Sequence, residues 1–272
     1  MLLQQCLRVV ILSFGLSLLS SCYLVPGIFD ATLVILRDGN FTYRYSGEIV
    51  FADIEHPPEN DWNDKNAKCF DYVEATQRSC TETEIKEQRV SYEADQAMSR
   101  QRAAEAAELT GFDAYDSAAN QKFASELMHY DGWKNVVYKG RGVFAVEYEI
   151  SGMLDRSYVF PTIPNAQVIV PFLSIHPSKY GVVNIAAPGL IGGSAKNFVM
   201  QQLPKSDEKD LQFWSRIKGN FKLTTDAELS FYNGKPVRVS GNKREAIVNW
   251  QINAGEVSLT SGKAPEAQVI LP

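Results

Sequence analysis

The residues most able to carry chemistry in this 272-residue chain are four cysteines, three histidines and a group of acidic side chains. Cys22 stands out because Leu19-Ser20-Ser21 precedes it directly, behind an apolar run. An aliphatic residue and two small residues before a cysteine form the lipobox, where bacteria cut a signal peptide and attach diacylglycerol. The expected chemistry at Cys22 is therefore acylation of its sulfur, which makes it a lipid anchor.

Residues 1–21 have the composition of a lipoprotein signal peptide. Arg8 is their only charged residue, and the apolar run Val9–Leu19 follows it. That run is too short to cross about 30 Å of hydrocarbon as a helix, so cleavage fits better than a permanent span. We expect a tether over residues 22–29. Tyr23 occupies the position where an aspartate favours retention in the inner membrane, so the periplasmic face of the outer membrane is favoured.

Cys69 and Cys80 are the cysteines that remain after Cys6 is lost with the signal peptide and Cys22 is acylated. Two thiols in an oxidising compartment are expected to pair, and a disulfide closing so short a loop contributes about 2 to 3 kcal/mol. A metal site is the alternative. It lacks a nearby pair of histidines, so the sequence predicts a Cys69–Cys80 disulfide.

Other motifs fall short of a catalytic pattern. S-x-x-K occurs at Ser215–Lys218 and at Ser240–Lys243, without the companion motifs of penicillin-binding enzymes. The segment Gly189–Ser194 is rich in glycine but lacks the Gly-Lys-Ser/Thr ending of a phosphate loop. We therefore predict no catalytic residue.

The histidines and the acidic loop give no metal site either. The histidines lie far apart in the sequence: His56, His129 and His176. The acidic loop contains five carboxylates: Asp53, Glu55, Glu59, Asp61 and Asp64. A calcium loop of the EF-hand type needs a glycine that this loop lacks, and Lys65 occupies a ligand position. The sequence thus predicts no metal and no cofactor.

Composition bounds the class of protein. Apolar residues make up 45% of the chain, enough for a sizeable core, and the net charge is −5 with both signs interspersed. A basic groove of the kind that follows a phosphate backbone is not indicated, so nucleic acid is excluded as a partner.

Alternating apolar and polar residues predict antiparallel strands along most of the chain. The first hairpin turns at Asp38-Gly39, a dipeptide typical of tight turns. The predicted strands are Ala31–Leu36, Phe41–Phe51, Trp133–Lys139, Val143–Ser151, Asn220–Phe231, Ala246–Ile252 and Ala267–Leu271. One face of each is apolar, which is the mark of a sheet with one buried face.

A helical insertion interrupts these strands at about 81–130. Thr81 and Glu84 form a capping box at the start of a helix over Thr81–Leu109, and a second helix covers Ser117–His129. We expect residues 30–272 to form a single α+β domain. Its curved antiparallel sheet should have the long and the short helix packed on one face.

Segment Tyr158–Met200 is nearly free of fixed charge, with Lys179 and Lys196 as the exceptions, and is interrupted by prolines and glycines. Two interpretations stay open. The segment forms buried strand edges and loops of the core, or it forms an apolar surface or cavity wall for a lipid, a membrane or a protein.

Several short elements follow a recognisable order, from a lipidated cysteine and hairpin, through a helical pair, to a late group of strands. The late group comprises Asp226–Leu229, Asn233-Gly234, Ser240-Gly241 and Val248-Asn249-Trp250. This order resembles that of the LppM-type lipoproteins. The resemblance implies an α+β domain that encloses an apolar cavity suited to lipid, and it brings no catalytic residues. The long helical insertion is a departure from that family.

Three functional hypotheses follow. The leading one is a non-enzymatic envelope lipoprotein that binds a lipid or another apolar ligand. The alternative is a scaffold or assembly factor that holds envelope proteins through the long charged helix. The third is a hydrolase, which needs a cluster of Ser, Asp or His that only the fold can bring together.

Overall fold

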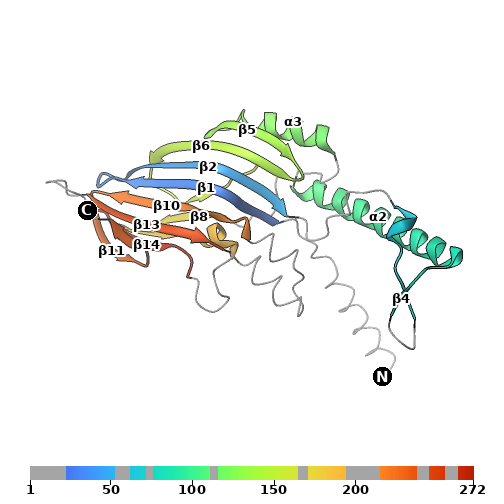
Figure 1. Ribbon diagram of the computed structural model, residues 1–272. Helices are drawn as coiled ribbons and strands as arrows, with labels where there is room; N and C mark the ends of the chain where they lie inside the picture. Colours follow the sequence, from blue (N-terminus) through green and yellow to red (C-terminus); the bar gives the residue numbers. More distant parts are fainter. Residues whose placement is uncertain are drawn as a thin grey trace, which may run out of the picture.

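The computed structural model describes residues 23–52, 62–71, 76–110, 116–164, 171–193, 215–237, 245–254 and 263–272. In these residues the strands form a seven-stranded sheet, a five-stranded sheet and a two-stranded ribbon (Figure 1). A long and a short helix accompany them, and nearly all strand pairs are antiparallel. The predicted α+β class is confirmed.

The seven-stranded sheet has the order β12-β13-β10-β1-β2-β6-β5. Its strands are β1 (Tyr23–Ile35), β2 (Asn40–Ala52), β5 (Trp133–Gly140), β6 (Val143–Met153), β10 (Lys218–Thr225), β12 (Lys235–Val237) and β13 (Ala246–Asn253). The central strand β1 pairs antiparallel with β2 and parallel with β10. One face carries the apolar side chains, and the other carries polar pairs such as Arg44 with Glu149.

The five-stranded sheet has the order β11-β14-β9-β8-β7. Its strands are β7 (Tyr158–Phe160), β8 (Leu173–Pro177), β9 (Val182–Ala186), β11 (Glu228–Tyr232) and β14 (Glu266–Ile270). A 3-10 turn, η2 (Pro188–Ile191), follows β9. Buried side chains in this region include Phe160, Phe172, Leu173, Ile175, Val183, Ile185 and Leu190. For the described part of 158–200, the interpretation as buried core is therefore confirmed.

Aromatic side chains fill the space between the two sheets. The ring of Phe160, from the five-stranded sheet, lies 5.2 Å from Tyr43, 5.0 Å from Tyr45 and 4.7 Å from Tyr148, centroid to centroid. These tyrosines come from β2 and β6 of the larger sheet. Ring pairs at such distances are in direct contact, so the second sheet covers the apolar face that was predicted to lie beneath the helices.

Helix α3 (Ser117–Leu127) covers part of the same face. Its Phe123 ring lies 6.1 Å from Phe51 and 5.9 Å from Phe144, and the helix packs along β5. The predicted packing of the shorter helix on the sheet is thus confirmed.

Helix α2 (Glu82–Thr110) does not pack as predicted. It extends beyond the end of the seven-stranded sheet (Figure 1), and none of its described side chains is buried. The physical reason is that its sequence has no apolar stripe wide enough to bury against a sheet. The sheet face is also already occupied by the second sheet and α3.

The predicted tether at 22–29 is wrong for the residues that the structure describes, because β1 begins at Tyr23. Tyr23 pairs with Ala52 at the end of β2, and pairing continues to Pro26. A register shift between Pro26 and Phe29 accommodates the proline and the following glycine. These two residues, which favoured a tether in the sequence, mark a bulge in the strand instead.

The predicted strand Asn220–Phe231 is divided between the two sheets. It breaks at Asp226, whose carboxylate accepts a hydrogen bond from the Arg37 backbone, and Thr225 Oγ1 accepts one from the Ala227 N–H. The chain then crosses from β10 into β11. Alternation persists across the break because Ala227 is buried and Leu229 packs against the core in phase with β10, so periodicity could not reveal the crossing.

Removing the Tyr43 hydroxyl is expected to stabilise the protein. This hydroxyl is fully buried and has no hydrogen-bond partner among the described residues, whereas Tyr45 Oη donates to the Glu48 carbonyl at 2.6 Å. An unsatisfied buried polar group costs about 1 to 3 kcal/mol, so Tyr43→Phe should raise the free energy of unfolding by about 1 kcal/mol. Tyr45→Phe is the matched control and should lower it by about the same amount. Urea denaturation measures both, and equal signs would contradict the expectation.

Candidate functional site

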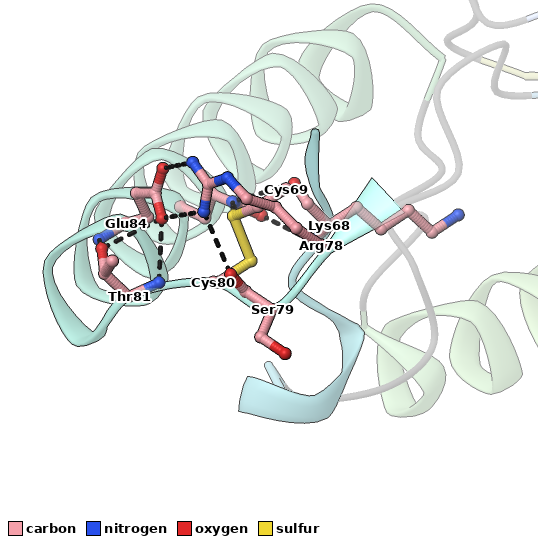
Figure 2. The surroundings of a disulfide bond; sticks show 8 residues. Lys68, Cys69, Arg78, Ser79, Cys80, Thr81 and Glu84 are labelled. Carbon is pink, nitrogen blue, oxygen red and sulfur yellow. Dashed lines mark hydrogen bonds and ion pairs between the residues drawn. A yellow bond between two sulfur atoms is a disulfide. The ribbon is translucent and has the colours of Figure 1, made fainter. Parts of the chain in front are cut away.

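Helix α2 and the segment before it form a projecting unit, which we call the arm (residues 62–71 and 76–110). The segment contains η1 (Asp64–Asn66), β3 (Cys69–Phe70) and β4 (Gln77–Arg78). β3 and β4 pair antiparallel and lie against the first half of α2 (Figure 2). The arm is thus a helix with a small ribbon fastened to one of its faces.

A disulfide joins Cys69 to Cys80, as the sequence predicted, with a Cα–Cα distance of 5.2 Å. It ties β3 to the residues directly before α2 (Figure 2). Gln88, about two turns into the helix, donates to the Lys68 carbonyl at 3.2 Å and to Cys69 Sγ at 3.4 Å. The helix therefore contacts the cross-link as well as the ribbon.

Glu84 connects the ribbon to the first turn of α2. Its carboxylate accepts hydrogen bonds from both Nη atoms of Arg78, at 2.9 and 2.6 Å, and from the Thr81 backbone at 2.8 Å. The Glu84 backbone N–H in turn donates to Thr81 Oγ1, so the predicted capping box is present. The Arg78 bonds, followed by those from Thr81, lower the pKa of Glu84 to about 2. The carboxylate therefore stays ionised at physiological pH.

Asp64 provides a second fastening, one turn further along the helix. It accepts from Trp62 Nε1 at 2.7 Å and pairs with Arg89, and the Arg89 bond is the main reason why the pKa of Asp64 is lowered. The Trp62 ring lies 5.6 Å from that of Tyr92. Gln88, Arg89 and Tyr92 lie on one face of α2, so η1 and the ribbon together cover that face.

The opposite face of α2 is open. Val90 is 58% exposed. Alanines 94 and 97 lie one and two turns further along this face and are also exposed. The arm therefore presents a mixed apolar and polar helix face around these three residues that is exposed in the described part of the chain.

Breaking the disulfide should loosen the arm and leave the sheets intact. Its loop contributes about 3 kcal/mol by loop closure, and the cross-link contacts the ribbon and α2 rather than the sheets. In the double variant Cys69→Ser, Cys80→Ser, amide hydrogen exchange should therefore rise in the first turns of α2 and stay unchanged in β2. A parallel loss of protection in β2 would show that the arm supports the whole fold.

A serine and a histidine meet on the outer surface of the five-stranded sheet, a pair that the sequence analysis missed. His176 Nδ1 lies 2.9 Å from Ser157 Oγ, and both side chains are exposed. Ser157 directly precedes β7 and His176 is in β8, so sequence spacing carried no signal. Among the described residues neither contacts a carboxylate, and Asn184 is the neighbour of His176 on β9. Without an orienting acid, the pair lacks the third member of a nucleophilic triad.

The other candidates from the sequence stay apart. Ser215 and His129 are exposed, and residues 188–191 form η2, with Gly192 ending it in a left-handed conformation. Within the described ranges, acidic, histidine and cysteine side chains make no group of three able to hold a metal ion. None of the described helices is long and apolar enough to span a bilayer.

Several residues with a predicted role lie outside the part of the chain that the structure describes. They are residues 1–21, Cys22, Asp53, Glu55, His56, Glu59, Asp61 and Ser240–Lys243.

Comparison with known proteins adds little. No protein family and no curated protein sequence matches the chain. Among solved structures, it is similar to the NMR structure of the folded domain of LppM from Mycobacterium tuberculosis, at 14% sequence identity and a TM-score of 0.27. The match covers 92% of each chain. A TM-score this low shows a weak resemblance and carries no argument about function.

Proposed function

We propose that this chain is a lipid-anchored, non-enzymatic protein of the bacterial envelope, and that it holds partner proteins through the arm. The lipobox supports the anchor at Cys22. The open face of α2 carries the proposal for the arm. A helix without a wide apolar stripe gains little by packing on its own domain and suits a bridge to another structure.

The construction of the arm supports the same role. The disulfide ties the ribbon to the residue pair directly before α2, the Arg78–Glu84 pair fastens the ribbon to the first turn of α2, and the Asp64–Arg89 pair fastens η1 to the helix. Fixing a binding element before it meets its partner reduces the entropy lost on binding. A braced helix is thus better prepared for docking than a free one.

Binding of a lipid or another apolar ligand, the leading hypothesis from the sequence, receives less support. It relied on segment 158–200, where Phe160, Phe172 and Leu190 are among the apolar side chains packed in the core. It stays a prediction. Native mass spectrometry of gently purified protein tests it, because a carrier should retain a lipid or take one up.

Site-specific crosslinking tests the scaffold role. A photoreactive amino acid replaces Val90 or Ala97 on the exposed face of α2 in the full chain, expressed in its host. Lys222, exposed on the outer face of β10, is the matched control. We expect a discrete crosslinked protein from the two arm positions and none from position 222. Equal crosslinking at all three positions, or none at the arm, would reject the proposal.

Intact-mass analysis tests the anchor. The mature protein should begin at Cys22 and carry the mass of its acyl chains, and it should sediment with outer-membrane vesicles in a density gradient. Cys22→Ala should prevent both processing and sedimentation. An unmodified N-terminus on the native protein would refute the anchor.

A further inference from the structure

The two ends of the Cys69–Cys80 disulfide differ in exposure. Cys69 is 6% exposed, whereas Cys80 is only partly buried. Cys80 lies on the short stretch of chain between β4 and α2, and Figure 2 shows the neighbouring Ser79 side chain directed away from the helix. Another molecule can therefore reach the cross-link more easily at Cys80 than at Cys69.

Cys80 also borders an open hollow on the surface of the arm. The walls of this hollow come from η1, β4 and the first turn of α2, and they include Asp64, Gln77, Ser79, Cys80 and Ile85. The buried Cys69 is not among the residues that line it. The hollow thus leaves room for a reactive loop of another protein beside one of the two sulfurs.

Gln88 holds a hydrogen-bond donor closer to the buried sulfur than to the other one. Its Nε2 lies 3.4 Å from Cys69 Sγ and 4.0 Å from Cys80 Sγ. Burial alone disfavours a charged sulfur at Cys69. A donor at this position offsets that cost, because hydrogen bonds to an ionised acceptor are stronger than those to a neutral one. Cys69 is therefore the sulfur that is better prepared to leave as a thiolate.

We propose that this disulfide is a site of thiol–disulfide exchange with a dithiol protein, and that the exchange passes through Cys80. One thiolate of the dithiol protein attacks Cys80 Sγ, the bond between the two sulfurs of the arm breaks, and the Cys69 sulfur leaves with the electron pair. The second thiolate of the dithiol protein then attacks the mixed disulfide and releases Cys80. The dithiol protein is oxidised to a disulfide, and the two cysteines of the arm are reduced and take up the protons that its thiols have lost.

The attacking molecule needs two thiols because Cys69 stays next to the mixed disulfide. The Cα atoms of the two cysteines are 5.2 Å apart, so the released Cys69 thiolate can attack Cys80 again and restore the cross-link. A second thiol on the attacking protein competes with this reversal in a step within one complex, whereas a monothiol has no such step. The exchange concerns the arm of the proposed function, but it depends neither on the anchor at Cys22 nor on which protein the arm holds.

Trapping the mixed disulfide tests which sulfur is attacked. The full oxidised chain, with any free thiols blocked by N-ethylmaleimide, is mixed with a thioredoxin whose resolving cysteine is replaced by serine, and acid stops the reaction. Trypsin cuts after Lys68 and after Arg78, so Cys69 and Cys80 fall on separate peptides. We expect at least tenfold more thioredoxin on Cys80 than on Cys69.

Two outcomes of the trapping experiment overturn the proposal. The first is equal linkage to both cysteines, or more linkage to Cys69. The second is the absence of any adduct on the folded chain while the same chain, unfolded in urea beforehand, forms one. Neither outcome affects crosslinking from Val90, so the proposed function is tested separately.

Replacing Gln88 tests the departure of Cys69. Gln88→Met keeps the length of the side chain and removes the donor, so reduction of the disulfide by dithiothreitol should slow about fivefold. If Gln88 only held the ribbon against α2, its loss would loosen the ribbon and speed the reduction. Gln101→Met is the matched control, since the Gln101 amide donates to Glu105 further along α2, and it should leave the rate unchanged. An unchanged or faster rate in Gln88→Met overturns the proposed role of Cys69 as the leaving sulfur.

Discussion

Raising the pH above 10 is expected to unfold this protein steeply. Burial raises the pKa of Tyr43 and Tyr45 well above the ordinary value, and it is also the main cause of the raised pKa of Tyr148 and Tyr158. In the unfolded chain these phenols ionise near pH 10. Folding keeps them protonated, so their contribution to stability is fully present below pH 10 and is lost as the pH rises.

The expected size is large because the contributions add. Each tyrosine that ionises only on unfolding reduces stability by about 1.4 kcal/mol per pH unit, so the two fully buried ones alone give about 3 kcal/mol per unit. Denaturant titrations at several pH values give this slope. Tyr43→Phe should lower this slope by about 1.4 kcal/mol per pH unit, because one tyrosine fewer ionises on unfolding. Tyr180→Phe, at an exposed position, should leave the slope unchanged. A slope near zero between pH 10 and 12 would contradict the burial of these phenols.

Truncating Phe172 is expected to cost a large part of the stability of the protein. Its ring is fully buried between the sheets, 6.1 Å from Tyr45 and 5.9 Å from Phe160. Phe172→Ala removes these contacts and leaves a cavity, which typically costs about 3 to 5 kcal/mol. Whole domains are stable by about 5 to 15 kcal/mol, so the variant should be close to unfolding.

The matched control for this variant is Phe231→Ala. Phe231 lies in β11 of the same sheet but is 46% exposed, so its loss should cost less than about 1 kcal/mol. Chemical denaturation of both variants compares them directly. Similar losses for the two would show that the sheets do not share a core at Phe172.

Local chemistry made part of this fold predictable. The Asp38-Gly39 turn, the Thr81–Glu84 capping box and the Cys69–Cys80 pair depend on residues close together in sequence, and each is present. Helix α3 was found with nearly the predicted bounds. In these cases interactions between residues of one short segment are enough to select its structure.

The distribution of strands between sheets was not predictable in this way. The alternation through Thr225 and Leu229 is continuous although these residues lie in different sheets, because a period of two reports one buried face and not its partner. The location of α2 away from the core also depends on which elements cover the sheet face. The second sheet, through Phe160, and α3, through Phe123, already occupy that face. The contact of Ser157 with His176 needs β7 and β8 to be paired first.

The central position of β1 has a mechanical consequence. Its neighbours β2 and β10 hold it on both sides, over pairs that run from Tyr23 to Ile35 and from Ile28 to Ile35. A pull on its N-terminal end acts along the strand and across its hydrogen bonds, so many bonds share the load at once. An edge strand would peel open one bond at a time. A protein dragged by that end thus transmits tension into its most heavily bonded element.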